Sequence, residues 1–337
     1  SVESCGLVKF DFLGLKTSTI IHEAMKHVRA SDPALADMDI LDIPFEDEGI
    51  IKMLNDGYCQ GIFQLESAGM VKSLQQIRPT SWEDLVAIIS LFRPGPMDNI
   101  PSYANRKNGA EPVQVPHPKL KKLLSETQGI IVYQEQVMQA AQLLAGYTLA
   151  EADLLRRAMG KKIPAEMEAQ RDRFIEGCTN QLVVAETTNG KKFSMRPDAE
   201  LTRADGKGKL SPEEAREAGS EILIGDMRFQ IAQISPASCA RINKERAGEL
   251  FDLIDKFSGY GFNKSHAAAY ALLAWQSAWL KFYHPAAFYS AALTYNDDFD
   301  KLRQIGREAK DRGVEFLPPN LDKSSVNFTP EATDDGH

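Results

Sequence analysis

Basic side chains grouped along this sequence are well suited to holding a phosphate. Residues 154–162 (LLRRAMGKK) carry four cations near the expected end of a helix: Arg156, Arg157, Lys161 and Lys162. The guanidinium fork of arginine binds two phosphate oxygens at once. Cations at a helix C-terminus also complement the helix dipole, so a solvated capping cluster is the alternative interpretation. Asp153 can balance only Arg157, at a spacing of four residues, which leaves the other three cations for an anion.

A second basic group lies in residues 259–270 (GYGFNKSHAAAY). Two glycines precede a helix whose first turn is expected to carry Lys264, Ser265 and His266, and the free N–H groups of a helix N-terminus attract anions. The alternative is an ordinary serine-capped core helix with His266 at its rim. The spacing of a P-loop is absent, which argues against a P-loop NTPase.

Arg93 and Asp11 are two further candidate site residues. Prolines in residues 91–97 (LFRPGPM) hold Arg93 in a rigid loop, where it either faces a site or caps the preceding helix. Residues 8–13 (VKFDFL) alternate like a short strand, with Lys9 and Asp11 on one face. A partly buried carboxylate is costly without a partner, so Asp11 pairs either with Lys9 or with a metal ion.

The whole chain has the composition of a folded protein with two or three domains: 337 residues, 43% apolar and 26% charged. It contains no long uncharged apolar run, so we expect no membrane association and a cytoplasmic location. Its four cysteines show no C-x-x-C spacing, which disfavours a zinc site or a disulfide framework. The net charge is −8, but residues 106–122 are locally basic, which suits a nucleic acid or nucleotide.

Hydrophobic periodicity predicts a mainly helical protein. We expect helices at residues 15–28, 46–56, 65–77, 82–91, 134–145, 149–159, 165–176 and 267–282, and from about residue 244. Residues 79–81 (PTS) offer an N-cap for the helix at residues 82–91. Residues 93–118, with six prolines, are expected to form a long ordered loop. The pattern is helical again from residue 119 and is broken at residues 127–129 (TQG). Residues 181–242 change character, with a hairpin turn at residues 188–191, and we interpret them as a β-rich insertion. Asn243 near its end is followed by Lys244, which disfavours an intein.

The order of these motifs resembles one family, the α subunits of bacterial DNA polymerase III, which are C-family replicative polymerases. The resemblance rests on these segments: residues 8–15 (VKFDFLGL), 61–67 (GIFQLES), 92–96 (FRPGP), 133–138 (YQEQVM), 154–162, 259–270 and 279–281 (WLK). It covers residues 1–180 and 243 to about 320. Residues 181–242 have no counterpart in the family pattern.

The resemblance implies a mainly α fold with minor β structure. Residues 1–16 would be the last strand of a palm related to polymerase β, residues 17–180 the first part of helical fingers, residues 181–242 the insertion, and residues 243–337 the second part of the fingers. It also implies template-directed DNA synthesis, in which a dNTP adds to a primer 3′-hydroxyl. The complete site would hold two Mg²⁺ ions on Asp11 and two aspartates upstream of this chain, so we expect the chain to be an inactive fragment by itself.

The resemblance assigns roles to the basic residues as well. Arg156, Arg157 and His266 would contact the triphosphate, Lys9 would lie near the phosphates or the primer end, and Lys161, Lys162, Lys264 and Ser265 would be neighbours. Arg93 would line the same site. The implied partners are primer-template DNA, dNTPs, the rest of the polymerase chain, the sliding clamp, the clamp loader and the proofreading exonuclease, in the bacterial cytoplasm. The alternative is a non-catalytic helical module that binds nucleic acid or nucleotide.

Overall fold

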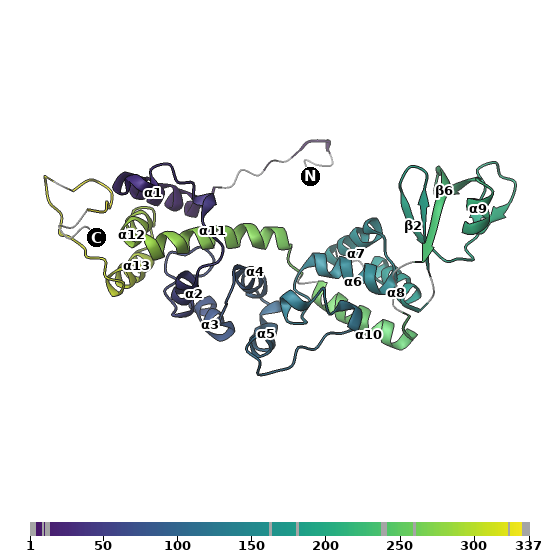
Figure 1. Cartoon of the computed structure of the whole chain (residues 1–337), viewed down its shortest axis with the longest axis horizontal. Helices are drawn as coiled ribbons and strands as arrows, with labels where there is room; N and C mark the ends of the chain where they lie inside the picture. Colours follow the sequence, from purple (N-terminus) through teal and green to yellow (C-terminus); the bar gives the residue numbers. More distant parts are fainter. Residues whose placement is uncertain are drawn as a thin grey trace. The chain divides into compact units, whose positions relative to one another are not determined.

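The computed structural model describes residues 5–8, 10, 14–161, 164–179, 182–236, 241–258, 261–322 and 324–331. The chain divides into two compact units. Figure 1 shows the helices and strands, with colours that follow the residue number. Unit 1 comprises residues 1–92 and 266–337, and unit 2 comprises residues 93–265. Helices predominate in the described residues and the strands are few, which confirms the predicted fold class. None of these helices is long and apolar enough to cross a membrane.

Unit 1 is built from helices. They are α1 (Lys16–Ser31), α2 (Glu48–Asn55), α3 (Ala68–Ile77), α4 (Trp82–Leu91), α12 (Pro285–Thr294), α13 (Phe299–Asp311) and all but the first two residues of α11 (Lys264–Tyr283), with short 3-10 turns at Pro33–Leu35 and Ile40–Asp42. The predicted N-cap of α4 is confirmed, because the Ser81 hydroxyl accepts from the Asp84 N–H and the Asp84 carboxylate accepts from the Ser81 N–H. This reciprocal capping satisfies two backbone donors at the start of the helix.

The core of unit 1 forms around the second half of α11. Helix α1 packs on α12, and α12 packs on α13. Every residue of α11 from Ala274 to Lys281 is buried, so this part of the helix is covered on all sides. The Trp275 indole N–H donates to the Pro44 carbonyl at 2.8 Å, which fixes α11 to the segment before α2.

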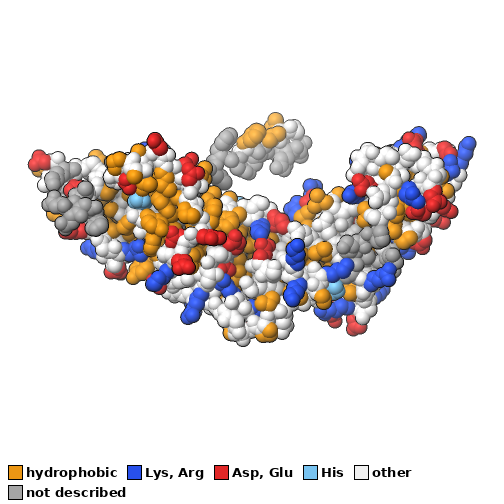
Figure 2. All heavy atoms as spheres, in the orientation of Figure 1, with side chains coloured by type: hydrophobic (Ala, Val, Ile, Leu, Met, Phe, Trp, Pro, Cys, Tyr) orange, Lys and Arg blue, Asp and Glu red, His pale blue; other side chains and the backbone are white. Residues whose placement is uncertain are grey.

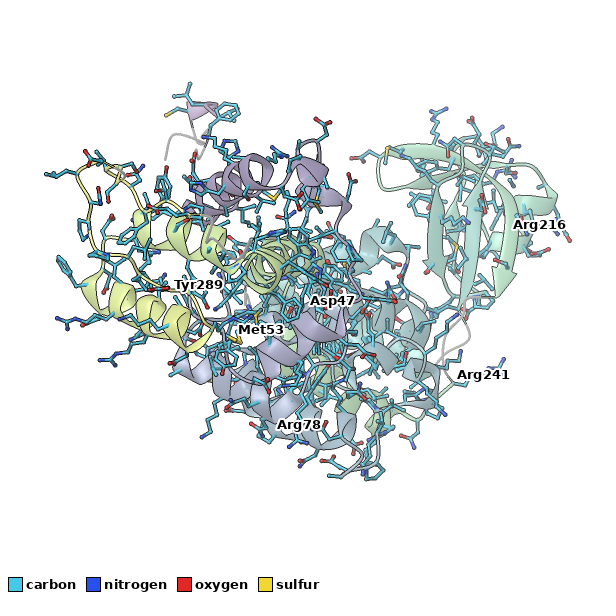
Figure 3. The ribbon with its side chains drawn as sticks, turned by 60° about the vertical axis from the view of Figure 1, so that its left-hand side comes forward. Asp47, Met53, Arg78, Arg216, Arg241 and Tyr289 are labelled. Carbon is cyan, nitrogen blue, oxygen red and sulfur yellow. The ribbon has the colours of Figure 1, made fainter. Side chains whose placement is uncertain are left out.

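One buried position on α11 is charged. The Lys281 side chain is 0% exposed and forms an ion pair with Glu308 of α13, whose side chain is 9% exposed. Its ammonium group also donates to the Gln60 carbonyl at 2.7 Å. The Glu308 carboxylate accepts from the Tyr289 hydroxyl at 2.9 Å and from the Gln60 N–H at 3.1 Å. Figure 3 labels Tyr289 among the helices of this unit. The network therefore ties α11, α12 and α13 to Gln60, the residue before the GIFQLES segment.

Unit 2 has a helical part and a β-rich part. Its helices are α5 (Ile100–Lys107), α6 (Gln134–Ala145), α7 (Leu149–Lys161), α8 (Pro164–Thr179), α9 (Pro212–Glu217) and α10 (Lys244–Ser258), with 3-10 turns at Pro96–Asn99, Pro118–Leu120 and Ser125–Thr127. Helices α6, α7, α8 and α10 pack together around one apolar core that includes Leu144, Leu155, Phe174 and Phe251 (Figure 1).

The β-rich part contains an antiparallel sheet in the order β2-β1-β6-β5. Its strands are β1 (Val183–Thr187), β2 (Lys192–Met195), β5 (Glu221–Ile224) and β6 (Met227–Pro236), and a second pair consists of β3 (Leu201–Thr202) and β4 (Lys209–Leu210). In the β1–β2 hairpin Val184 lies opposite Ser194. Helix α9 packs on β6, and Ala215, Ile222 and Phe229 form a separate small core. The strands and the hairpin turn predicted for this segment are confirmed.

The structure corrects two of the predicted elements. The expected loop at residues 93–118 contains α5, because Ile100, Tyr103 and Ala104 form a buried face and proline is tolerated in the first turn of a helix. The helix expected from residue 119 is instead a pair of 3-10 turns, and the predicted break at residues 127–129 is confirmed by the left-handed Gln128 and Gly129. Most of the predicted strand at residues 8–13, including Lys9 and Asp11, lies outside the described residues. The predicted domain boundaries stay a prediction.

A close helix contact gives one prediction about stability. A Cβ atom at Gly177 of α8 would lie 2.0 Å from the Ala145 carbonyl oxygen, whereas a Cβ at Gly160 of α7 would meet nothing within 4 Å. We expect Gly177→Ala to destabilise unit 2 by about 3 kcal/mol, because backbone must shift to relieve the overlap. Gly160→Ala should be stabilising by about 0.5–1 kcal/mol through helix propensity. Urea unfolding followed by circular dichroism measures both, and an unchanged midpoint for Gly177→Ala would contradict the described contact.

Candidate nucleotide-binding site

Segments far apart in the sequence meet at the start of α11. Residues 132–134 and 261–263 run side by side in parallel, with Tyr133 opposite Phe262. The Phe262 N–H donates to the Val132 carbonyl at 3.1 Å, and the Gln134 N–H donates to the Phe262 carbonyl at 2.9 Å. Residues 132–134 and 261–263 are therefore neighbours in unit 2, a relationship that their separation in the sequence does not reveal.

The guanidinium group of Arg93 contacts the same segment. Its Cζ atom lies 4.3 Å from the centroid of the Phe262 ring. Burial lowers the pKa of Arg93 below its ordinary value, and stacking on an aromatic face suits the flat, weakly hydrated guanidinium group. The prediction that the FRPGP segment fixes the direction of Arg93 agrees with this geometry.

Lys264 is held by acidic and aromatic neighbours. Its ammonium group donates to the Glu126 carboxylate at 2.6 Å, in an ion pair whose side chains are 42% and 37% exposed. The same nitrogen lies 5.3 Å from the centroid of the Tyr133 ring. The Lys264 backbone N–H donates to the Glu135 carboxylate, at 3.1 Å to Oε2. A protein carboxylate thus accepts from the Lys264 N–H, and the anion site expected at this helix start stays a prediction.

Arg156 and Arg157 share one carboxylate on α7. Asp153 accepts from Arg156 Nη2 at 2.8 Å and from Arg157 Nε at 2.9 Å. The hydrogen bond from Arg156 and the charges of both arginines lower the pKa of Asp153. The sequence-based expectation that Asp153 balances only Arg157 is therefore wrong, because Arg156, three residues away, also forms an ion pair with Asp153. The outer faces of both guanidinium groups stay accessible, with Arg157 63% and Arg156 36% exposed.

The first turn of α11 carries Lys264, Ser265 and His266, as predicted. Ser265 and His266 are exposed. The division between the two units falls between them, so His266 is described with unit 1. There the His266 ring lies edge-on to Tyr270 at 4.3 Å, and Phe63 of the GIFQLES segment stacks on Tyr270 at 5.1 Å. His266 therefore starts an aromatic series in unit 1.

The basic segment at residues 106–122 splits into structural and exposed cations. Arg106 pairs with Glu111 at 2.9 Å and donates to the carbonyls of Gln114 and Gln128, so it fastens its own loop. Lys119, Lys121 and Lys122 are exposed around the 3-10 turn that follows His117. Figure 2 shows lysine and arginine side chains over this helical part of unit 2. The exposed lysines, and not Arg106, are the members of this segment that an acidic partner can reach.

Several predicted site residues cannot be placed. Lys9, Asp11 and Lys162 lie outside the described residues, and only the backbone of Lys161 is described, at the end of α7. Within the described part of the chain, no group of three or more His, Cys, Asp or Glu side chains is arranged to hold a metal ion. The proposed Mg²⁺ site is therefore not tested by this structure.

The structure adds residues that the sequence did not single out. Glu126, Tyr133 and Glu135 contact Lys264, and Phe63 and Tyr270 extend the ring series from His266. Four of these five residues lie in the motifs quoted above, and membership of a motif was the sequence feature that could have identified them. Their roles depend on contacts between distant segments, which a single sequence does not display.

The fold is mainly helical, and comparison with known proteins gives the family of the chain. Residues 17–182 match the family model described as the bacterial DNA polymerase III alpha subunit finger domain. The match ends where the β-rich part begins. The relatives described below nevertheless align with nearly the whole chain, so the expectation that residues 181–242 have no counterpart in the family is wrong. The chain belongs to the family of bacterial DNA polymerase III alpha subunits.

Three relatives illustrate the similarity, and each is named DNA polymerase III subunit alpha. The protein of Caulobacter vibrioides is 40% identical over 331 residues, covering 98% of this chain and 24% of the relative. That of Thermus aquaticus is 38% identical, covering 97% and 22%. That of Escherichia coli is 38% identical, covering 99% and 24%. The chain thus spans about a quarter of the length of these relatives.

Proposed function

We propose that this chain forms the fingers of a replicative DNA polymerase and binds the triphosphate of the incoming deoxynucleotide. The observation that carries the proposal is the meeting of the FRPGP, YQEQ and GFNKSH motifs around the start of α11 in a chain of this family. Distant motifs that meet at one place commonly build one site. Template-directed nucleotidyl transfer to a primer 3′-hydroxyl is the reaction that this site would serve.

Different basic residues would contact different parts of the nucleotide site. Arg156 and Arg157 would bind triphosphate oxygens, since Asp153 fixes their direction and leaves their outer faces exposed. Lys264, Ser265 and His266 would add contacts from the first turn of α11, and Arg93 would support that turn through Phe262. Phosphoryl transfer depends on positioning and on neutralising phosphate charge, which cations held in this way supply.

Two Mg²⁺ ions would supply the activation of the primer hydroxyl and the neutralisation of the leaving pyrophosphate. We propose Asp11 as one of their ligands, with Lys9 beside the phosphates, from the family resemblance of residues 8–15. The chain alone would be inactive, because one carboxylate cannot position two ions.

The partners of the whole polymerase are part of the same proposal. Primer-template DNA would lie against exposed lysines such as Lys121 and Lys122, because phosphate contacts supply most of the sequence-independent affinity for DNA. The rest of the polymerase chain, and in the holoenzyme the sliding clamp, the clamp loader and the proofreading exonuclease, would act with it in the bacterial cytoplasm.

Nucleotide binding by this chain tests the proposal without requiring catalysis. Fluorescence anisotropy with a labelled deoxynucleoside triphosphate should show binding that Arg156→Ala and Arg157→Ala each weaken by about tenfold or more, since hydrogen bonds between charged groups contribute about 1.5–3 kcal/mol. Arg171 is a matched control, because it is exposed and paired with Asp252 at 3.2 Å, and Arg171→Ala should leave the affinity unchanged. Equal affinities for all four proteins would contradict the assignment of the arginine pair.

Polymerase activity is tested in a chimera. This chain replaces the matching segment of the Caulobacter vibrioides subunit, and primer extension is compared with that of the isolated chain. Extension by the chimera alone supports the proposal. A folded chimera that binds nucleotide and DNA without extending the primer would favour the non-catalytic binding module.

A further inference from the structure

The YQEQ segment touches the start of α11 through side chains as well as through its backbone. The Gln134 side-chain amide donates to the Gly261 carbonyl at 3.2 Å. The Asn263 side-chain amide donates to Glu135 Oε1 at 2.9 Å, and the Lys264 N–H donates to the same carboxylate. The Glu135 carboxylate thus accepts hydrogen bonds from the Asn263 side chain and from the Lys264 backbone, where α11 begins.

The position of Glu135 is itself fixed by its neighbour. Gln136 is 2% exposed. Its Oε1 atom accepts from the N–H groups of Val132 and Tyr133 at 2.8 and 3.0 Å, and its Nε2 atom donates to the Thr127 hydroxyl at 2.9 Å. A buried amide with these partners holds the YQEQ backbone rigidly. The backbone that carries the Glu135 side chain is therefore held in a fixed position next to the start of α11.

The two carboxylates around Lys264 differ in how easily they can be replaced. Glu126 binds the mobile end of the side chain in a half-exposed pair, which is a weak interaction in water. Glu135 binds the backbone N–H at the helix N-terminus, where a negative group satisfies a donor and complements the helix dipole. A triphosphate can displace Glu126 from the ammonium group while Glu135 keeps the helix start in place.

We infer that Glu135 is a positioning residue for nucleotide binding. It contacts no substrate. It fixes the backbone at Asn263 and Lys264, so that the side chains of the first turn of α11 meet the triphosphate without an ordering cost at each binding event. The inference rests on the proposed function, and it adds a residue to which neither composition nor spacing assigned a role.

The test combines hydrogen exchange and nucleotide binding on this 337-residue chain. In Glu135→Ala, amide exchange in residues 261–268 should rise by about tenfold, and affinity for a labelled deoxynucleoside triphosphate should fall by about five- to tenfold, the scale of a lost helix cap. Glu135→Gln keeps an oxygen acceptor and should restore most of both quantities. Gln139→Ala, an exposed change on the same helix, should alter neither.

Each other outcome overturns the inference in a recognisable way. Unchanged exchange in Glu135→Ala would show that the carboxylate does not hold the helix start. Faster exchange with unchanged affinity would show that the nucleotide does not depend on this backbone. If the wild-type chain binds no triphosphate while exchange still responds, the proposed function fails and Glu135 is only a helix cap.

Discussion

Glu308→Gln is expected to destabilise unit 1 by about 3–5 kcal/mol, because it leaves the buried Lys281 ammonium group without a counter-charge. Lys281 is fully buried, and its other polar partner is the Gln60 carbonyl. Tyr289 and Gln60 donate to different oxygens of Glu308, and the glutamine amide has one oxygen, so the variant loses one of these hydrogen bonds together with the charge. Urea unfolding followed by tryptophan fluorescence measures this unit selectively, since Trp82, Trp275 and Trp279 all lie within it.

Two controls accompany this measurement. Asp56→Asn removes the partner of Lys52 from an exposed pair in the same unit, with side chains 76% and 44% exposed, and should cost less than about 1 kcal/mol. Lys281→Met combined with Glu308→Gln should recover much of the stability, because no buried charge remains. A loss for Glu308→Gln no larger than that for Asp56→Asn would contradict the buried network.

The same network gives a dependence on pH. Burial lowers the pKa of Lys281 to about 8 from 10.5, against the opposing pull of Glu308. Between these values the unfolded chain binds more protons than the folded chain, so the free energy of unfolding should rise as the pH increases above about 8. Burial raises the pKa of Cys59 from 9.0 to about 12 and opposes this rise above about pH 9. The rise should be absent in Lys281→Met.

Asp11→Asn is expected to reduce primer extension by the chimera by about a thousandfold or more. Metal ions stabilise charge in such a transition state by several kcal/mol, and each 1.4 kcal/mol is tenfold in rate. Asparagine keeps the shape of the side chain and removes the negative charge that we propose as a ligand for Mg²⁺. Nucleotide binding by the isolated variant chain should stay within about twofold, because the proposed triphosphate contacts lie on the basic residues.

The outcome separates the two functions proposed from the sequence. Loss of extension with retained binding supports a catalytic role for Asp11 in a polymerase. Full extension by Asp11→Asn would remove Asp11 from the catalytic site. Lys9→Met is the companion variant, and it should lower extension less than Asp11→Asn if Lys9 only neutralises phosphate charge.

Local patterns predicted most of the helices, because apolar faces and caps are short-range signals. The Ser81 cap of α4 and the hairpin between β1 and β2 follow from neighbouring residues, and both were expected. One failure occurred where tertiary contacts outweighed local preference, because proline content suggested a loop where Tyr103 and its neighbours fold into α5. The other was local, because only the four-residue spacing to Arg157 was considered, whereas Asp153 also pairs with Arg156 three residues away.

By itself the sequence determined the family, the mainly helical fold and the residue types that suit a triphosphate, since these depend on motif order and periodicity. Only the tertiary structure decided which distant residues contact one another. Glu135 meets Lys264 across 129 positions of sequence, and Lys281 meets the Gln60 carbonyl across 221. Such pairs form because burial of the surrounding apolar side chains brings distant segments together, and no periodicity within either segment specifies the partner.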